Sequence, residues 1–139
     1  MLIMKTFTIL KPDTVNAGNA GAIISKLEKE GFRIRAMKML HLTETQAQGF
    51  YYVHKERPFF SSLVKFMTEG PVILIVLEAD NAIEKLRKVM GATDPTKADA
   101  GSIRREFGTN IERNAIHGSD GPETAAFEIS YFFNQLEIV

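Results

Sequence analysis

Hydrophobic and polar positions change their spacing several times along the chain, and each change marks an expected element. Residues 3–11 (IMKTFTILK) are rich in β-branched and aromatic side chains, which is typical of a strand. Residues 71–79 (PVILIVLEA) are apolar almost throughout, so we expect a strand that is buried on both faces and central in its sheet. Residues 32–42 predict another strand, and a short fourth one is expected within 114–120 (NAIHGSD).

Helical spacing separates these strands. In residues 19–31, Ile23, Ile24 and Leu27 fall on one face, and Gly31 suits the position just after a helix. Further helical segments are expected over 43–54 with a Thr43–Gln46 capping box, 57–70 with Pro58 at its start, 81–91 with Ile83, Leu86 and Met90 buried, 102–108, and 121–133.

The order of these elements predicts the fold class. Four strands with helices between them indicate an α+β protein, and a split βαβ order predicts a ferredoxin-like, four-stranded antiparallel sheet with helices packed on it. No repeat or linker interrupts the 139 residues, so we expect a single domain over 1–139. The loop over 92–102 is longer than most connections, which favours a functional role.

Composition narrows the classes of function. Hydrophobic residues make up 45% of the chain, enough for a core, and there are no cysteines for disulfides or thiolate chemistry. Seventeen basic residues balance 17 acidic ones, so no bulk attraction to nucleic acid is expected. No apolar run is long enough to span a membrane, and the first residues are too polar for a signal peptide. We therefore expect a cytoplasmic protein with no membrane or specific nucleic-acid partner.

His117 is the first candidate for chemistry. A histidine can act as a base, an acid, a metal ligand or a nucleophile, or it can be a structural residue at a strand end. A nucleophilic histidine needs one bare ring nitrogen and an acceptor for the other, and Glu128 on the last expected helix is a candidate acceptor. His41, His54 and His117 show no metal-ligand spacing.

Three cations accompany this histidine as candidates. Lys11 ends the first expected strand, Arg87 flanks the buried stripe of a helix, and Arg104 lies beside the long loop. Each one alone is more commonly a surface cation, but together they could clamp a polyphosphate through charge and bidentate hydrogen bonds. No G-x-x-x-x-G-K-[ST] loop is present, so side chains, with Mg²⁺, would have to hold any phosphates.

Aromatic residues gather in FYYVHKERPFF, over residues 50–60. Tyr51, Tyr52, Phe59 and Phe60 fall around an expected helix-to-helix turn. Aromatic faces could stack on a nucleobase of any kind, although aromatics at helical spacing more commonly belong to a core. The aromatic residues alone leave both interpretations open.

These features occur together in one known family. The chain resembles the nucleoside diphosphate kinases along almost its whole length, and NAIHGSD is a highly specific motif of that family. The other matching stretches are TFTILKPD, FYYVHKERPFF, LVKFMTEGPV, LRKVMGATDP and AGSIRREFG.

The resemblance implies an activity and a set of roles. Such enzymes move the γ-phosphate of a nucleoside triphosphate, typically ATP, to another nucleoside diphosphate, such as GDP, by a ping-pong mechanism through a phosphohistidine. It implies that His117 is phosphorylated at its pros nitrogen, that Lys11, Tyr51, Ser119 and Glu128 assist catalysis, and that Lys11, Phe59, Arg87, Thr93, Arg104 and Asn114 bind the nucleotide.

The resemblance also implies a cofactor and an assembly. Mg²⁺ would be held by the nucleotide phosphates rather than by protein side chains. Stacking by Phe59 implies broad specificity for base and sugar. A homo-oligomer is implied, a tetramer or hexamer built from dimers.

Three alternatives remain at this stage. The first is an RNA-binding module, which ferredoxin-like folds also form, but no RNP1-like run is present. The second is a catalytically silent relative that acts as a regulatory subunit, against which the retained histidine, lysine and arginines argue. The third is a phosphohistidine donor to other proteins, which would use the same His117.

Overall fold

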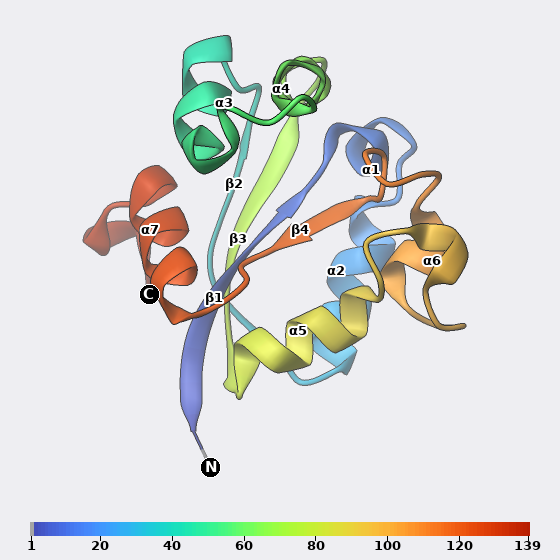
Figure 1. The fold of residues 1–139 in the computed structure, drawn as a ribbon. Helices are drawn as coiled ribbons and strands as arrows, with labels where there is room; N and C mark the ends of the chain where they lie inside the picture. The colour runs from blue at the N-terminus through green and yellow to red at the C-terminus, as the bar shows by residue number, and fades with distance from the viewer. Residues whose placement is uncertain (1) are drawn as a thin grey trace.

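A computed structural model describes residues 2–139, and the four strands and the predicted helices follow the expected order (Figure 1). The strands are β1 (Ile3–Leu10), β2 (Arg33–Leu40), β3 (Val72–Asp80) and β4 (Ile116–Gly118). The α-helices are α1 (Pro12–Asn16), α2 (Ala20–Lys29), α3 (Glu44–Phe50), α4 (Phe60–Met67), α5 (Ala82–Met90), α6 (Ile103–Phe107) and α7 (Pro122–Phe132).

The four strands form one sheet in the order β2-β3-β1-β4, and every neighbouring pair is antiparallel. The predicted α+β class with a ferredoxin-like antiparallel sheet is confirmed, and β3 is central as predicted. β4 is short, but it pairs with β1 so that Ile9 lies opposite His117 and Thr8 opposite Gly118. This pairing brings the histidine beside the end of the first strand.

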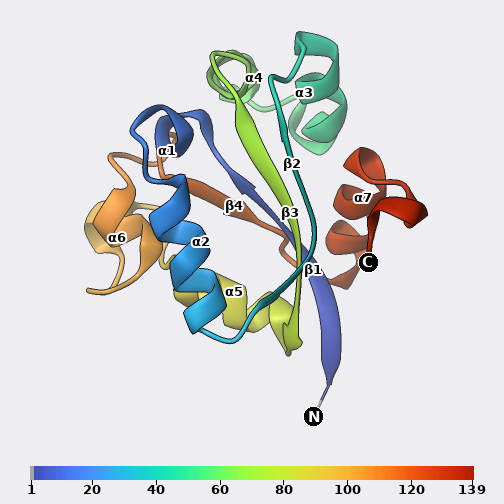
Figure 2. The same ribbon diagram turned by 180° about the vertical axis from the view of Figure 1, so that it is seen from behind.

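Helices cover both faces of the sheet (Figures 1 and 2), and a separate apolar layer lies beneath them on each face. α3, α4 and α7 pack on one face, and α2, α5 and α6 pack on the other. Because side chains alternate along a strand, β3 contributes to both layers, and it is apolar from Val72 to Leu77. Its residues Val72, Leu74 and Val76 face the first layer, and Ile73, Ile75 and Leu77 face the second.

The segment between α3 and α4 differs from the expected pair of long helices. The Thr43–Gln46 capping box forms as predicted, but α3 ends at Phe50 and a 3-10 turn follows over Tyr52–His54. Pro58 precedes α4 instead of starting it. The Phe60 amide donates to the Arg57 carbonyl, which closes a turn with proline at its favoured second position.

The helix α1 directly after β1 was not predicted. It has five residues, which is too short for a hydrophobic period to be visible, and Pro12 occupies its first turn. The long loop before α6 also contains a 3-10 turn over Pro95–Lys97. No helix within residues 2–139 is long and apolar enough to cross a membrane.

Candidate active site

A cavity of about 390 Å³ opens where β1 and β4 end, between the α3–α4 segment, α5 and α7. Most of the residues predicted for the site line it, and Asn114 and Ser119 are buried behind it. The predicted residues in the lining are Lys11, Tyr51, Phe59, Arg87, Thr93, Arg104, His117 and Glu128.

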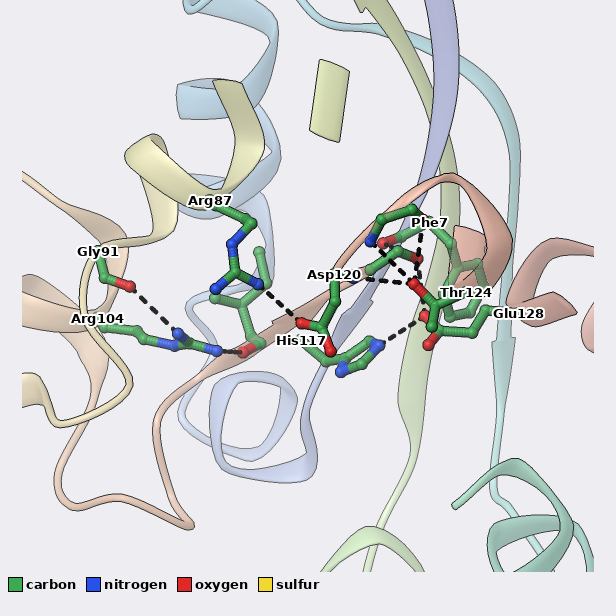
Figure 3. Close-up of polar contacts among 11 residues, drawn as sticks. Phe7, Arg87, Gly91, Arg104, His117, Asp120, Thr124 and Glu128 are labelled. Carbon is green, nitrogen blue, oxygen red and sulfur yellow. Dashed lines mark hydrogen bonds and ion pairs between the residues drawn. The ribbon is translucent and has the colours of Figure 1, made fainter. Parts of the chain in front are cut away.

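His117 is held at its ring and at its backbone. Its Nε2 lies 2.7 Å from Oε1 of Glu128, and the Ser119 hydroxyl donates to the same oxygen at 2.7 Å. A carboxylate oxygen accepts, so Nε2 carries a hydrogen, and in the neutral imidazole Nδ1 is then the bare nitrogen. The Thr8 hydroxyl donates to the His117 carbonyl at 2.6 Å. Figure 3 shows the imidazole between Glu128 on one side and two arginines on the other.

Aromatic rings pack against the imidazole. The ring centroids of Phe7, Phe50 and Tyr51 lie 6.3, 5.5 and 6.3 Å from that of His117, each in an edge-on arrangement. The Tyr51 hydroxyl is buried and has no hydrogen-bond partner among residues 2–139. Burial, and then the negative charge of Glu128, raises the pKa of Tyr51 well above its ordinary range. Tyr51 therefore stays a neutral donor beside the histidine.

Lys11 reaches the cavity from the end of β1. Its Nζ donates to Oδ1 of Asn114 at 2.8 Å, and the Asn114 amide donates to the Thr93 carbonyl at 3.0 Å. Burial, and then the positive charge of Arg104, lowers the pKa of Lys11 from 10.5 to about 8. An ammonium that is poorly compensated in this way favours an anionic ligand.

The two arginines lie side by side on the other flank of the cavity (Figure 3). Arg104 donates to the carbonyls of Gly91 at 3.2 Å and Ile116 at 2.8 Å, so its guanidinium is fixed by backbone. Burial, and then the charge of Arg87, lowers the pKa of Arg104 to about 10. Arg87 pairs with Asp120 at 2.8 Å, and both side chains are largely exposed. These cations make this flank suited to phosphate groups.

Comparison with known proteins explains this arrangement. A family model described as nucleoside diphosphate kinase matches residues 4–138. The chain belongs to the nucleoside diphosphate kinase family. It is 56% identical over 135 residues to the nucleoside diphosphate kinase of Geotalea uraniireducens, which covers 97% of this chain and 98% of the relative. The Trichlorobacter lovleyi enzyme is 58% identical with the same coverage.

Solved structures of nucleoside diphosphate kinases share the fold. The Aquifex aeolicus enzyme superposes with a TM-score of 0.97 at 47% identity, covering 99% of this chain and all of that one. The Halobacterium salinarum enzyme, solved in complex with CDP, has a TM-score of 0.95 at 38% identity, covering 99% and 92%. The predicted family is confirmed, and the chain is a phosphotransferase.

Sequence reasoning missed three residues with polar side chains that line the kinase cavity. Asp120 lies in the NAIHGSD motif but was given no role, and only the structure shows that it pairs with Arg87. His54 lies in the aromatic stretch, with its ring centroid 5.4 Å from that of Phe59. Thr124 accepts hydrogen bonds from the amides that precede α7, including that of Asp120 at 3.1 Å. Their spacing in the sequence carries no signal of a shared cavity.

The carboxylates of the kinase cavity do not form a metal cage. Among residues 2–139 there is no group of three or more histidines, cysteines or carboxylates that could hold an ion. Glu128 is occupied by His117 and Ser119, and Asp120 faces the cations. This donor set suits a divalent ion that arrives with phosphate oxygens as its main ligands.

Proposed function

We propose that this chain transfers the γ-phosphate of a nucleoside triphosphate, typically ATP, to another nucleoside diphosphate through a phosphohistidine at Nδ1 of His117. The observation that carries the proposal is the 2.7 Å contact between Nε2 and Glu128. It fixes the ring so that the other nitrogen is free, inside a cavity that also holds a lysine and two arginines.

The reaction divides into two in-line steps. Nδ1 of His117 attacks the γ-phosphorus, and the bond from that phosphorus to the bridging oxygen breaks, releasing the nucleoside diphosphate. A second diphosphate then attacks the phosphohistidine, and the P–N bond breaks to return the free imidazole. Glu128 accepts the hydrogen bond from Nε2 throughout, and Ser119 holds the carboxylate in place. Splitting the transfer in this way is characteristic of nucleophilic catalysis.

The nucleotide phosphates would be held by Lys11, Arg87, Thr93, Arg104 and Asn114. The lowered pKa values of Lys11 and Arg104 support this role, because burial leaves both cations short of compensating charge. When bound, Mg²⁺ would neutralise charge on the phosphates, and Asp120, which pairs with Arg87, is a carboxylate in the cavity lining. The chain's own contribution is to position the phosphates in line with the imidazole.

The base would stack on Phe59, whose side chain is 47% exposed beside the cavity. Every base has a π-face, so stacking without polar contacts predicts broad acceptance of purines and pyrimidines and of ribo- and deoxyribonucleotides. His54 packs against Phe59 and would support that ring or contact a phosphate.

We also expect a cytoplasmic homo-oligomer, a tetramer or hexamer built from dimers. Met37 and Met39 on the edge strand β2 are 51% and 57% exposed, and exposed apolar side chains on a strand edge favour a covered surface. Sedimentation equilibrium of the purified protein tests the assembly, and a single species at 15.6 kDa would refute it.

A labelling experiment tests the chemistry. The protein is mixed with Mg²⁺ and γ-labelled ATP, freed of nucleotide, and then given unlabelled GDP. We expect an acid-labile, alkali-stable label that leaves on GDP as GTP. His117→Ala should take no label. His41→Ala is the matched control, because His41 is exposed and, within residues 2–139, its ring hydrogen-bonds to the Thr68 carbonyl alone. Equal labelling of His117→Ala and wild type would refute the proposal.

A further inference from the structure

Ala115, two residues before His117, has a backbone conformation that alanine rarely adopts. Its φ is 74° and the residue is fully buried. A positive φ brings the β-carbon close to the backbone, so it persists only where the surroundings hold it. The Ile116 amide donates to the Asn114 carbonyl at 2.9 Å, which closes a three-residue γ-turn around Ala115.

The segment that follows β1 holds this turn through the backbone amide and the backbone carbonyl of Ala115. The Ala115 amide donates to Oδ2 of Asp13 at 3.0 Å. Its carbonyl accepts from the Thr14 hydroxyl at 2.9 Å and from the Lys11 amide at 3.0 Å. Oδ1 of Asp13 is buried as well, so this carboxylate is turned inward rather than toward solvent.

The residues on either side of the turn belong to the site. Asn114, just before it, contacts Nζ of Lys11 and the Thr93 carbonyl. Ile116, just after it, accepts from Arg104 through its carbonyl, and His117 follows. A change in the turn would therefore shift the phosphate-binding side chains and the nucleophile relative to each other.

We propose that Asp13 and Thr14 are positioning residues for phosphoryl transfer, which act by holding Ala115 in the turn that sets Asn114 and His117 against Lys11. Neither residue lines the cavity. The inference rests on the proposed role of His117. A misplacement of about 1 Å is enough to cost a large factor in rate when chemistry depends on alignment.

Asp13 also acts on the site through charge, and this is the competing explanation. Its carboxylate raises the pKa of Lys11, against the larger lowering by burial and Arg104. Two substitutions separate the effects. Asp13→Asn removes the charge but keeps an oxygen for the Ala115 amide. Ala115→Gly restores nothing electrostatic, but glycine adopts a positive φ without steric cost, so the turn needs less support.

The experiment measures the first-turnover rate of His117 phosphorylation by rapid quench with γ-labelled ATP at saturation. We expect Asp13→Ala to be slower by about tenfold, the order of rate loss that release of one strained residue can cause. Asp13→Asn should stay close to wild type. Adding Ala115→Gly to Asp13→Ala should restore most of the rate. Asp80→Ala, which removes an aspartate that accepts the Leu2 amide at the far end of the sheet, should change nothing.

The outcomes are distinct. Equal loss in Asp13→Asn and Asp13→Ala, with no rescue by Ala115→Gly, would assign the effect to charge and overturn the inference. A wild-type rate in Asp13→Ala would overturn it as well. If Asp13→Ala does not fold, Thr14→Val replaces it as the test, because it removes only the hydroxyl hydrogen bond to Ala115. A loss of rate in Thr14→Val that Ala115→Gly reverses supports the inference, and an unchanged rate contradicts it. A wild type that takes no label would instead refute the proposed function.

Discussion

The lysine at the end of β1 gives the site a measurable dependence on pH. Burial, and then Arg104, lowers the pKa of Lys11 to about 8. The ammonium is therefore about nine-tenths protonated at pH 7 and only about one-tenth protonated at pH 9. If its charge is needed to bind the phosphates, kcat/KM should fall above pH 8 and approach a tenfold loss for each pH unit.

The titration of other groups does not obscure this fall of kcat/KM at high pH, the alkaline limb of the pH profile. Nucleotide phosphates are already fully ionised above pH 8, because their last pKa lies near 6. Burial raises the pKa of Tyr51 out of the range, and the pKa of Arg104 is about 10, so the measurement runs from pH 7 to about 9.5. A bound polyphosphate favours the protonated lysine, so the limb of kcat should lie at higher pH than the limb of kcat/KM.

The assay is steady-state phosphate transfer from ATP to a second diphosphate, with Lys11→Arg as the comparison. A guanidinium keeps its charge across this range, so the variant should be less active at pH 7 but should lose the limb near pH 8. A wild-type kcat/KM that is flat to pH 9.5 would refute the reasoning, as would the same limb in both proteins.

Four more outcomes can be measured. Because the pKa of Lys11 is lower in the folded chain, the unfolded chain binds more protons between about pH 8 and 10.5. The free energy of unfolding in urea should therefore rise with pH in this range, by at most about 1.4 kcal/mol per pH unit. Lys11→Met should lack this rise. Glu128→Gln should lower kcat/KM by about 10- to 100-fold, since it removes the charge from a hydrogen bond worth about 1.5–3 kcal/mol; an unchanged kcat/KM would contradict its role. Phe59→Ala should raise KM by a similar factor for ADP, GDP and CDP, and a base-dependent effect would reject stacking as the sole contact. Gly118→Ala should destabilise by about 1–3 kcal/mol in urea, because its β-carbon would lie 2.6 Å from Sδ of Met90; an unchanged midpoint would show that the core yields freely.

The sequence predicted the sheet well because its strands have distinct hydrophobic patterns. β3 is apolar on both faces, which marked it as central, and β1 shows the β-branched pattern of a strand. Short elements were harder to predict from the sequence. α1 has only five residues, so nothing periodic marks it, and the start of α4 depends on a turn that only the folded chain reveals. Local pattern cannot encode such tertiary choices.

The candidate residues of the site were found for a different reason. His117, Lys11 and the arginines were weak candidates one by one, and only their match to a known family joined them. The structure brings them to one cavity. It also adds Asp120, whose partner Arg87 lies 33 positions earlier on another element. The positive φ of Ala115 could not be foreseen either, because alanine gives no sign of it in a sequence.

The pairing of β1 with β4 has a consequence for the order of folding. These strands are separated by more than a hundred positions along the chain, and β4 contributes only three residues. Closing this pair therefore has a large entropic cost of loop closure, and few backbone hydrogen bonds compensate it. We expect it to form late, after the β1–β3 pair. Since the proposed nucleophile His117 lies on β4, the capacity to take up phosphate should return after the far-ultraviolet circular dichroism signal during refolding. The labelling reaction would then report the final step of assembly.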